Sequence, residues 1–226
     1  MAEIALSTKQ QGDGNGSDGT TRTAAGTRMG ELYTAHPASL YDRWLRGGKV
    51  FEAHFATEGG SATVEANATL DLTEPFFRFT VPSSKVCVPI KVKVTPTVVW
   101  VTADGVIIYT SDTDTYTTGG AAPDVRNMAS VNSSDSALGT SAVTSIFDGD
   151  SVLTEAALTN PRVIDITWFR TGGLFIPYEY NILKGDPMVM IHGTSSFCVA
   201  AQATGALEVH YSIIWAELDK SELVNS

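Results

Sequence analysis

The stretch S84KVCVPIKVKV94 decides the fold class of this chain. The apolar side chains that recur in it at every second position are Val86, Val88, Ile90, Val92 and Val94. Successive side chains of a β-strand point to opposite faces, so a period of two predicts a strand with one buried face. Valine and isoleucine also favour strands because they branch at Cβ.

The same alternation continues on both sides of this stretch, from about Lys49 to Leu218. It recurs in SATVEANATLDL, FFRFTV, TVVWVTADGVIIYT, RVIDITWFR, LFIPYEY, SFCVAAQA and ALEVHYSIIWAEL, with turn residues at nearly every junction. Asp104-Gly105 suits the tight turn of a hairpin. Only SVLTEAAL, around Leu153, looks helical in this part of the chain. The pattern predicts an all-β domain over residues 49–226, either a closed barrel or, as the better fit, an eight-stranded antiparallel jelly-roll sandwich.

Residues 1–48 have a different composition. Up to Met29 the chain is rich in glycine, serine, threonine, glutamine and alanine, which predicts a flexible arm. A short helix follows, with Ser39 as its expected N-cap and Gly47-Gly48 as its stop. The apolar face of that helix consists of Leu40, Tyr41, Trp44 and Leu45. A helix this short is not stable alone, so we expect this face to dock on something.

A long polar segment interrupts the strand pattern at residues 111–160. Serine, threonine, aspartate, glycine and alanine dominate it, and strand signals are few. Long segments of this kind inside a compact domain are usually either functional excursions or disordered. We therefore expect an exposed loop that displays recognition residues on a rigid sandwich.

Charge and composition exclude some functions. The net charge is −10 and the chain has no cluster of lysine and arginine, so the electrostatic footprint of a nucleic-acid-binding protein is missing. No secretory signal and no apolar stretch long enough for a membrane span is visible. Cys87 and Cys198 both lie within predicted strands and are expected to be small buried hydrophobes.

No catalytic or metal-binding pattern emerges from the sequence. His36, His54, His192 and His210 are scattered, and we interpret His192, at a strand end, as a half-buried strand histidine. The pairs Asp112 and Asp114, and Asp148 and Asp150, lack the spacing of a calcium loop. The sequence thus predicts no enzyme, no cofactor and no metal.

Two motifs carry a resemblance to a known family. Gly30-Glu31, then Ser39-Leu40, then Trp44-Leu45-Arg46 precede the first expected strand, and FIPYEY enters a later one. The chain is similar in both to capsid proteins of the picornavirus-like group, especially those of dicistroviruses, iflaviruses and related marine RNA viruses. It departs from them in a longer gap after Gly30-Glu31 and in Tyr41, where arginine is common.

The resemblance implies a structural subunit of an icosahedral virus capsid. Such subunits assemble in the host cytoplasm, with copies of themselves or related jelly-roll subunits, into a virion that encloses an RNA genome without a basic arm. Leu40, Tyr41, Trp44 and Leu45 would then be assembly-interface residues, and the 111–160 segment would face a host receptor. Two alternatives stay open: a jelly-roll module that binds a receptor or glycan, and a small enzyme of the cupin or sandwich type.

Overall fold

The computed structural model describes residues 7–9, 21–23, 37–55, 62–64, 71–97, 104–129, 140–148, 153–169, 177–203 and 207–221. The chain divides into two compact units, Met1–Leu40 and Tyr41–Ser226. In the first, the short strands β1 (Ser7–Lys9) and β2 (Thr21–Thr23) pair antiparallel. The composition did not predict this pair, and the remainder of the expected arm, 1–29, lies outside the described residues.

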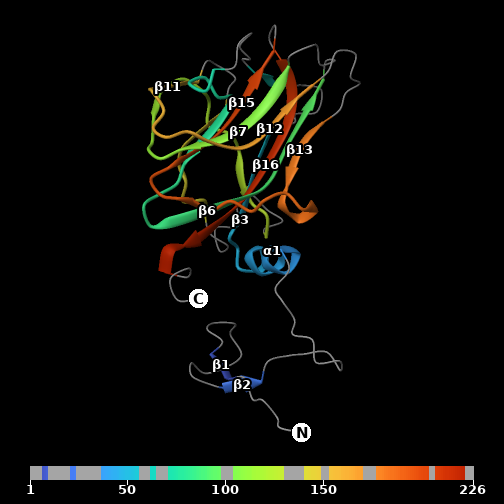
Figure 1. The fold of residues 1–226 in the computed structure, drawn as a ribbon, viewed down its shortest axis with the longest axis vertical. Helices are drawn as coiled ribbons and strands as arrows, with labels where there is room; N and C mark the ends of the chain where they lie inside the picture. The colour runs from blue at the N-terminus through green and yellow to red at the C-terminus, as the bar shows by residue number, and fades with distance from the viewer. Residues whose placement is uncertain are drawn as a thin grey trace. The chain divides into compact units, whose positions relative to one another are not determined.

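Among its described residues, the second unit contains two large antiparallel sheets and a further two-stranded one (Figure 1). The larger has the order β13-β6-β16-β3-β9, with β14 beside β6 and β4 beside β16; the smaller has the order β10-β5-β15-β7-β12. The strands of the larger sheet are β3 (Val50–Phe55), β4 (Ala62–Val64), β6 (Lys85–Pro96), β9 (Val125–Asn127), β13 (Tyr178–Asn181), β14 (Ile191–His192) and β16 (Leu207–Asp219). Those of the smaller are β5 (Phe77–Thr80), β7 (Gly105–Ser111), β10 (Thr144–Asp148), β12 (Arg162–Trp168) and β15 (Ser196–Gln202). The all-β, antiparallel prediction is confirmed.

The core lies between the inner faces of these sheets. All five alternating apolar residues of β6 are buried, as its period of two predicted. Phe79 of the smaller sheet stacks on Phe197 at a centroid distance of 4.9 Å and reaches Trp215 of the larger sheet at 5.1 Å. The ring centroids of Phe77, in the smaller sheet, and Tyr211, in the larger, lie 5.8 Å apart. These aromatic pairs join the two sheets into a sandwich.

The predicted hairpin at Asp104-Gly105 is wrong. Both hydrogen-bonding edges of β7 are occupied, one by β12 and the other by β15, so no strand before Asp104 can pair with it. Gly105 serves close packing instead, because a Cβ there would lie 2.6 Å from Cε3 of Trp168. Glycine in a strand often marks such a close approach, which is the structural reason for the misreading.

The segment 111–160 is more than an exposed loop. It holds β9, β10 and two further short strands, β8 (Tyr116–Thr118) and β11 (Thr154–Glu155), which pair with each other. Val143 and Leu153 are buried. The expectation of an exposed loop is therefore wrong for the buried part of this segment. The helix expected around Leu153 is also wrong, because residues 153–158 contain only β11. Of these short strands, β9 and β10 extend the two main sheets, while β8 and β11 form a sheet of their own, so the described strands exceed the eight predicted.

Candidate functional site

The first candidate site is the helix that sequence reasoning selected. Helix α1 spans Pro37–Arg46, so it begins two residues before the expected cap, Ser39. Proline is well tolerated at a first helical position, because the amide hydrogen it lacks has no partner there. The predicted glycine stop is confirmed: Gly48 has a φ of 66°, and the amide of Gly47 donates to the carbonyl of Arg43 at 3.0 Å.

The apolar side of α1 faces the sandwich of its own chain. Tyr41, Trp44 and Leu45 are half-buried and pack against the main core, and Leu40 is also half-buried. Asp42, Arg43 and Arg46 are exposed. The end of the core is thus covered by α1, and a polar helix surface is left outside. A contact of these residues with another subunit stays a prediction.

Tyr41 connects the helix to the edge of the larger sheet. Its hydroxyl lies 4.0 Å from Sδ of Met128, which follows β9. Burial, followed by the nearby carboxylates of Glu52 and Asp42, raises the pKa of the Tyr41 hydroxyl above its usual value. The amide of Met128 donates to the carbonyl of Val50 at 2.9 Å, so the helix, β3 and β9 support one another.

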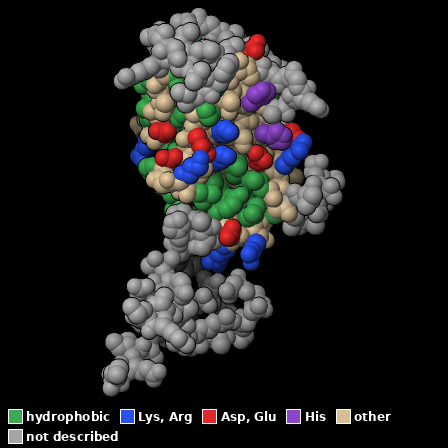
Figure 2. Space-filling model, turned by 90° about the vertical axis from the view of Figure 1, so that its right-hand side faces the viewer, with side chains coloured by type: hydrophobic (Ala, Val, Ile, Leu, Met, Phe, Trp, Pro, Cys, Tyr) green, Lys and Arg blue, Asp and Glu red, His purple; other side chains and the backbone are tan. Residues whose placement is uncertain are grey.

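A second candidate site lies on the outer face of the larger sheet. Strand register aligns His54, Ser212 and Lys93 in one row across β3, β16 and β6, and places His210 beside Thr95 in the next row. Figure 2 shows two histidine side chains close together on one side of the molecule, near a band of acidic and basic side chains, with a hydrophobic patch below the band.

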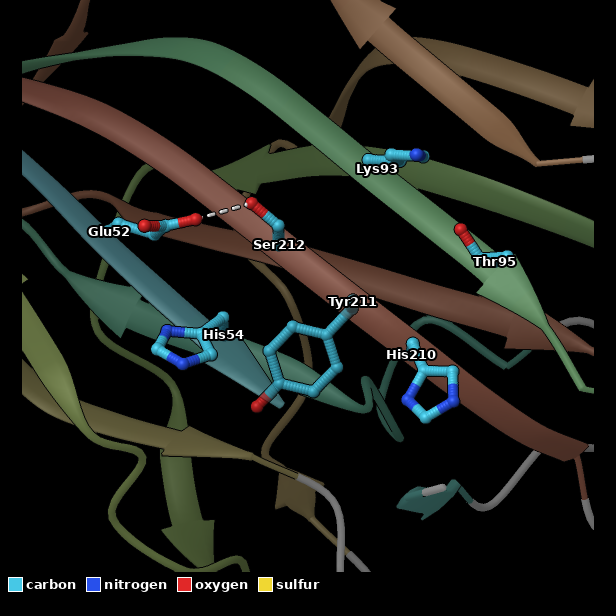
Figure 3. A pocket seen from close by; sticks show the side chains of 7 residues that line it. All are labelled: Glu52, His54, Lys93, Thr95, His210, Tyr211 and Ser212. Carbon is cyan, nitrogen blue, oxygen red and sulfur yellow. Dashed lines mark hydrogen bonds between the residues drawn. The ribbon is translucent and has the colours of Figure 1, made fainter. Parts of the chain in front are cut away.

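These rows enclose a depression of about 330 Å³, drawn in Figure 3. The residues that line it are Glu52, His54, Lys93, Thr95, His210, Tyr211 and Ser212. Ser212 Oγ donates to Glu52 Oε1 at 2.7 Å, so the one carboxylate of the lining has a partner. Sequence reasoning treated the two histidines as scattered, and only the register of β3 with β16 brings them together.

Several polar groups of this depression have no partner within the described part of the chain. The Nδ1 atoms of His54 and His210 are buried and make no hydrogen bond there. Among the described residues, no ion pair or side-chain hydrogen bond involves Lys93 or Thr95. On the same face, by contrast, Glu179 forms an ion pair with Lys184, whose Nζ lies 2.6 Å from Glu179 Oε2. Unpaired polar groups gathered in a hollow distinguish this part of the sheet from its surroundings.

A buried charge cluster occupies the outer face of the smaller sheet. Arg78 Nε lies 3.0 Å from Glu155 Oε1, and Arg78 Nη2 lies 2.7 Å from Asp114 Oδ1. The ring of Tyr116 lies 5.1 Å from the guanidinium carbon of Arg78. Sequence reasoning missed this cluster, although an arginine within the apolar run FFRFTV was a visible signal. The cluster attaches the 111–160 segment to the sheet.

The other residues singled out from the sequence are dispersed. His192 lies on β14 but is exposed, so its interpretation as a half-buried histidine is wrong. Asp148 accepts a hydrogen bond from the Tyr211 hydroxyl at 2.5 Å. Asp112 binds the side-chain amide of Asn160 at 3.1 Å. His36 and Asp150 lie outside the residues whose side chains are described. Within the described ranges no group of three or more metal-ligating side chains occurs.

Both cysteines are buried within strands, as predicted. Burial raises the pKa of each thiol well above its usual value, and the carboxylates of Glu217 and Glu155 add to the effect at Cys87 and Cys198 respectively. A buried thiol held protonated is a poor nucleophile, which fits their interpretation as small hydrophobes.

Comparison with known proteins does not assign the chain to a family. No protein-family model, no curated protein sequence and no solved structure matches it. No helix of the described residues is both long enough and apolar enough to cross a membrane.

Proposed function

We propose that the sandwich is a jelly roll. In that fold an antiparallel ribbon of eight strands, whose first strand pairs with the last, the second with the seventh, and so inward, is rolled into two sheets. The strands that fit this ribbon are, in chain order, β3, β5, β6, β7, β12, β13, β15 and β16, and β10 is added outside β5 at the edge of the smaller sheet. Their pairs β3·β16, β5·β15, β6·β13 and β7·β12 follow the ribbon pattern, and β6·β16 and β7·β15 close the two sheets.

The function that fits best is that of a structural subunit of an icosahedral virus capsid. The strand order carries this proposal, because it matches the fold that the capsid resemblance implies, a resemblance resting on Gly30-Glu31, Ser39-Leu40 and FIPYEY. Fold alone does not define function, so the motif resemblance and the strand order are needed together. The partners would be copies of this chain or related jelly-roll subunits, enclosing an RNA genome.

The described surface supports a role in assembly. A sandwich with a continuous core provides a rigid block, and α1 covers one end of that core with Tyr41, Trp44 and Leu45. The edge strand β12 has apolar side chains in solvent: Val163 is 52% exposed, Ile166 40% and Trp168 48%. Exposed apolar side chains on a sheet edge are typical of surfaces that meet other protein chains.

Recognition of a host receptor is the expected role of the 111–160 segment. Its attachment through Arg78 and Glu155 would hold the exposed parts, such as Thr117 and Thr118, in fixed positions. A rigid support lets a loop present side chains without losing them to disorder.

Particle formation tests the proposal directly. The full chain, expressed alone and together with the other jelly-roll subunits of the same genome, is examined by electron microscopy and analytical ultracentrifugation. Closed particles of uniform diameter that contain the chain are the expected result. A chain that stays outside particles under both conditions overturns the proposal. Discrete trimers that bind glycans or receptor-bearing cells would instead identify a receptor-binding module.

A further inference from the structure

We infer that the depression on the outer face of the larger sheet is a binding site for a phosphate group. The inference goes beyond the proposed capsid function and does not depend on it. It rests on the side chains of His54, Lys93, Thr95 and His210, which line one hollow and lack polar partners within the described residues.

The register of three neighbouring strands brings these groups together. His54 on β3 and Lys93 on β6 both lie opposite Ser212 of β16. His210 lies two residues from Ser212 on the same strand, and therefore on the same face, with Thr95 directly opposite it. Side chains directly opposite one another in a sheet have Cβ atoms about 5 Å apart, and diagonal neighbours are about 7–8 Å apart. His54 and Lys93 flank β16 and so start about 10 Å apart, with Thr95 one row further along β6. A phosphate group can meet the long side chains that lean over β16, and contact with all four requires a ligand that extends beyond the phosphate.

The burial of both imidazole Nδ1 atoms determines which nitrogen each ring offers. With Nδ1 of His54 and of His210 buried, the nitrogen left to meet a ligand in each ring is Nε2, which donates when it carries the ring proton. Each ring then presents an N–H donor. The ammonium of Lys93 and the hydroxyl of Thr95 add further donors, so the hollow is rich in donors. The positive charge of Lys93 is opposed by Glu52 in the lining and by Glu179, which lies opposite Lys93 on β13.

A phosphate fits this donor set better than a carboxylate does. A phosphate group offers three strong acceptor oxygens, whereas a carboxylate offers two oxygens in one plane. Donors that come from three strands surround a tetrahedral group more completely than a planar one. The volume of about 330 Å³ is larger than a single phosphate needs, so the ligand has a body attached to the phosphate.

The carboxylate of Glu52 opposes the binding of an anionic ligand in this hollow. It lines the hollow on the β3 side, with its Oε1 accepting from Ser212 Oγ at 2.7 Å (Figure 3). This hydrogen bond fixes the carboxylate but leaves its negative charge near the proposed phosphate, which weakens anion binding. A glutamine at position 52 can accept the same hydrogen bond without the charge.

Equilibrium dialysis of the full chain with radiolabelled ligands tests the inference, whether or not the chain forms particles. The probes are inorganic phosphate, ribose 5-phosphate and a short single-stranded RNA, at constant ionic strength. We expect saturable binding of one ribose 5-phosphate per chain, and weaker binding of inorganic phosphate at the same site. If RNA competes and binds more tightly than ribose 5-phosphate, the phosphate source is a nucleic-acid backbone; if RNA does not compete, it is a phosphorylated small molecule.

Four variants and two matched controls locate the site. We expect Lys93→Met to weaken phosphate binding at least tenfold, His54→Asn and His210→Asn each to weaken it severalfold, and Glu52→Gln to strengthen it. Lys91→Met removes a lysine from the same face of the same strand, and His192→Asn removes an exposed histidine. Both controls should leave the dissociation constant within twofold.

Two results would overturn the inference. One is the absence of saturable binding for all three probes. The other is an equal loss of affinity in Lys93→Met and Lys91→Met, which would indicate general charge attraction instead of a site. Thermal unfolding of each variant shows whether the fold is retained, and Glu52→Gln keeps the test decisive because it predicts a gain that misfolding cannot produce.

Discussion

Arg78 on β5 and Glu155 on β11 form an ion pair, Nε to Oε1 at 3.0 Å, in which neither side chain is exposed. Thr115 Oγ1 also donates to the Glu155 carboxylate, and Cys198 Sγ lies 3.4 Å from its Oε1. A buried carboxylate needs such partners, because removing a charge from water is costly. The pair therefore holds the 111–160 segment against the outer face of the smaller sheet.

Removing one member of this pair should be more harmful than removing both. In Arg78→Met the Glu155 carboxylate is left buried without its cation, and we expect a loss of about 3–5 kcal/mol in the free energy of unfolding. In the double variant Arg78→Met with Glu155→Met no fully buried charge is left, because Asp114, the other partner of Arg78, has a side chain that is 39% exposed. Replacement of a buried pair by apolar groups is often nearly neutral. Urea denaturation of both variants measures the difference. A double variant that loses as much stability as the sum of the two single ones would contradict this account.

The sequence predicted the elements whose pattern is local and missed those that depend on distant partners. The alternation of β6 and the glycine stop after α1 are local, and both are confirmed. Glu155 lies in SVLTEAAL, a segment with good helix formers, yet it is part of a short strand because its carboxylate pairs with Arg78 of β5. Tertiary contacts of this kind override local propensity.

The sequence did not predict the candidate site on the larger sheet, for a related reason. His54 and His210 are far apart in the chain, and neither has a metal-ligand or catalytic spacing to its neighbours. Only the antiparallel register, with His54 opposite Ser212, places them on one face. A period-two pattern identifies the outward-facing positions of a strand, but it does not identify the partner strand or its register.

The stability of the protein in acid should depend on Asp114. Burial acts to raise the pKa of this carboxyl, but hydrogen bonds from Arg78 and from the Tyr116 amide outweigh it, so the pKa in the folded state is lowered. A lowered folded-state pKa gives a stabilisation that is present above the unfolded value of about 3.9 and is lost as the pH falls through the folded value.

We therefore expect Asp114→Asn to destabilise the protein at neutral pH and to make little difference at the most acidic pH at which it still folds. Urea midpoints measured across the acid range for wild type and variant test this. Asp42→Asn, which removes an exposed carboxylate from α1, controls for a general change in net charge. Parallel pH curves for wild type and Asp114→Asn would refute the assignment.

Gly105 and Trp168 should be energetically coupled. A Cβ at position 105 would lie 2.6 Å from Trp168 Cε3 and 3.0 Å from the carbonyl oxygen of Thr167. We expect Gly105→Ala to cost about 1–3 kcal/mol, as overpacking of a strand usually does. In a Trp168→Ala background the ring is gone, and the same substitution should cost distinctly less. Thermal or urea unfolding of the four proteins gives the coupling energy, and a coupling near zero would mean that the backbone contact alone excludes a side chain.

The two sides of helix α1 should separate folding from assembly. Trp44 packs against the core of its own chain, so Trp44→Asp places a charge on an apolar contact, and we expect it to lower both the free energy of unfolding and the particle yield. Arg43 and Arg46 are exposed in the last turn of α1. Both are positively charged, whereas the protein as a whole has a net charge of −10. On a second copy they would meet a predominantly acidic surface, which favours attraction.

Charge reversal at both arginines, Arg43→Glu with Arg46→Glu, should therefore reduce particle yield while the unfolding midpoint falls only slightly. Part of that small fall is expected in any case, because acidic side chains near a helix C-terminus oppose the helix dipole. The substitution pair Arg43→Gln with Arg46→Gln serves as the matched control, since it removes the charges without reversing them, and it should give an intermediate yield. Particle yield is measured by sedimentation and electron microscopy, and stability by thermal unfolding of the unassembled subunit. If the reversed variant assembles in normal yield while Trp44→Asp fails only because it unfolds, α1 closes the core of its own chain and takes no part in contacts between subunits.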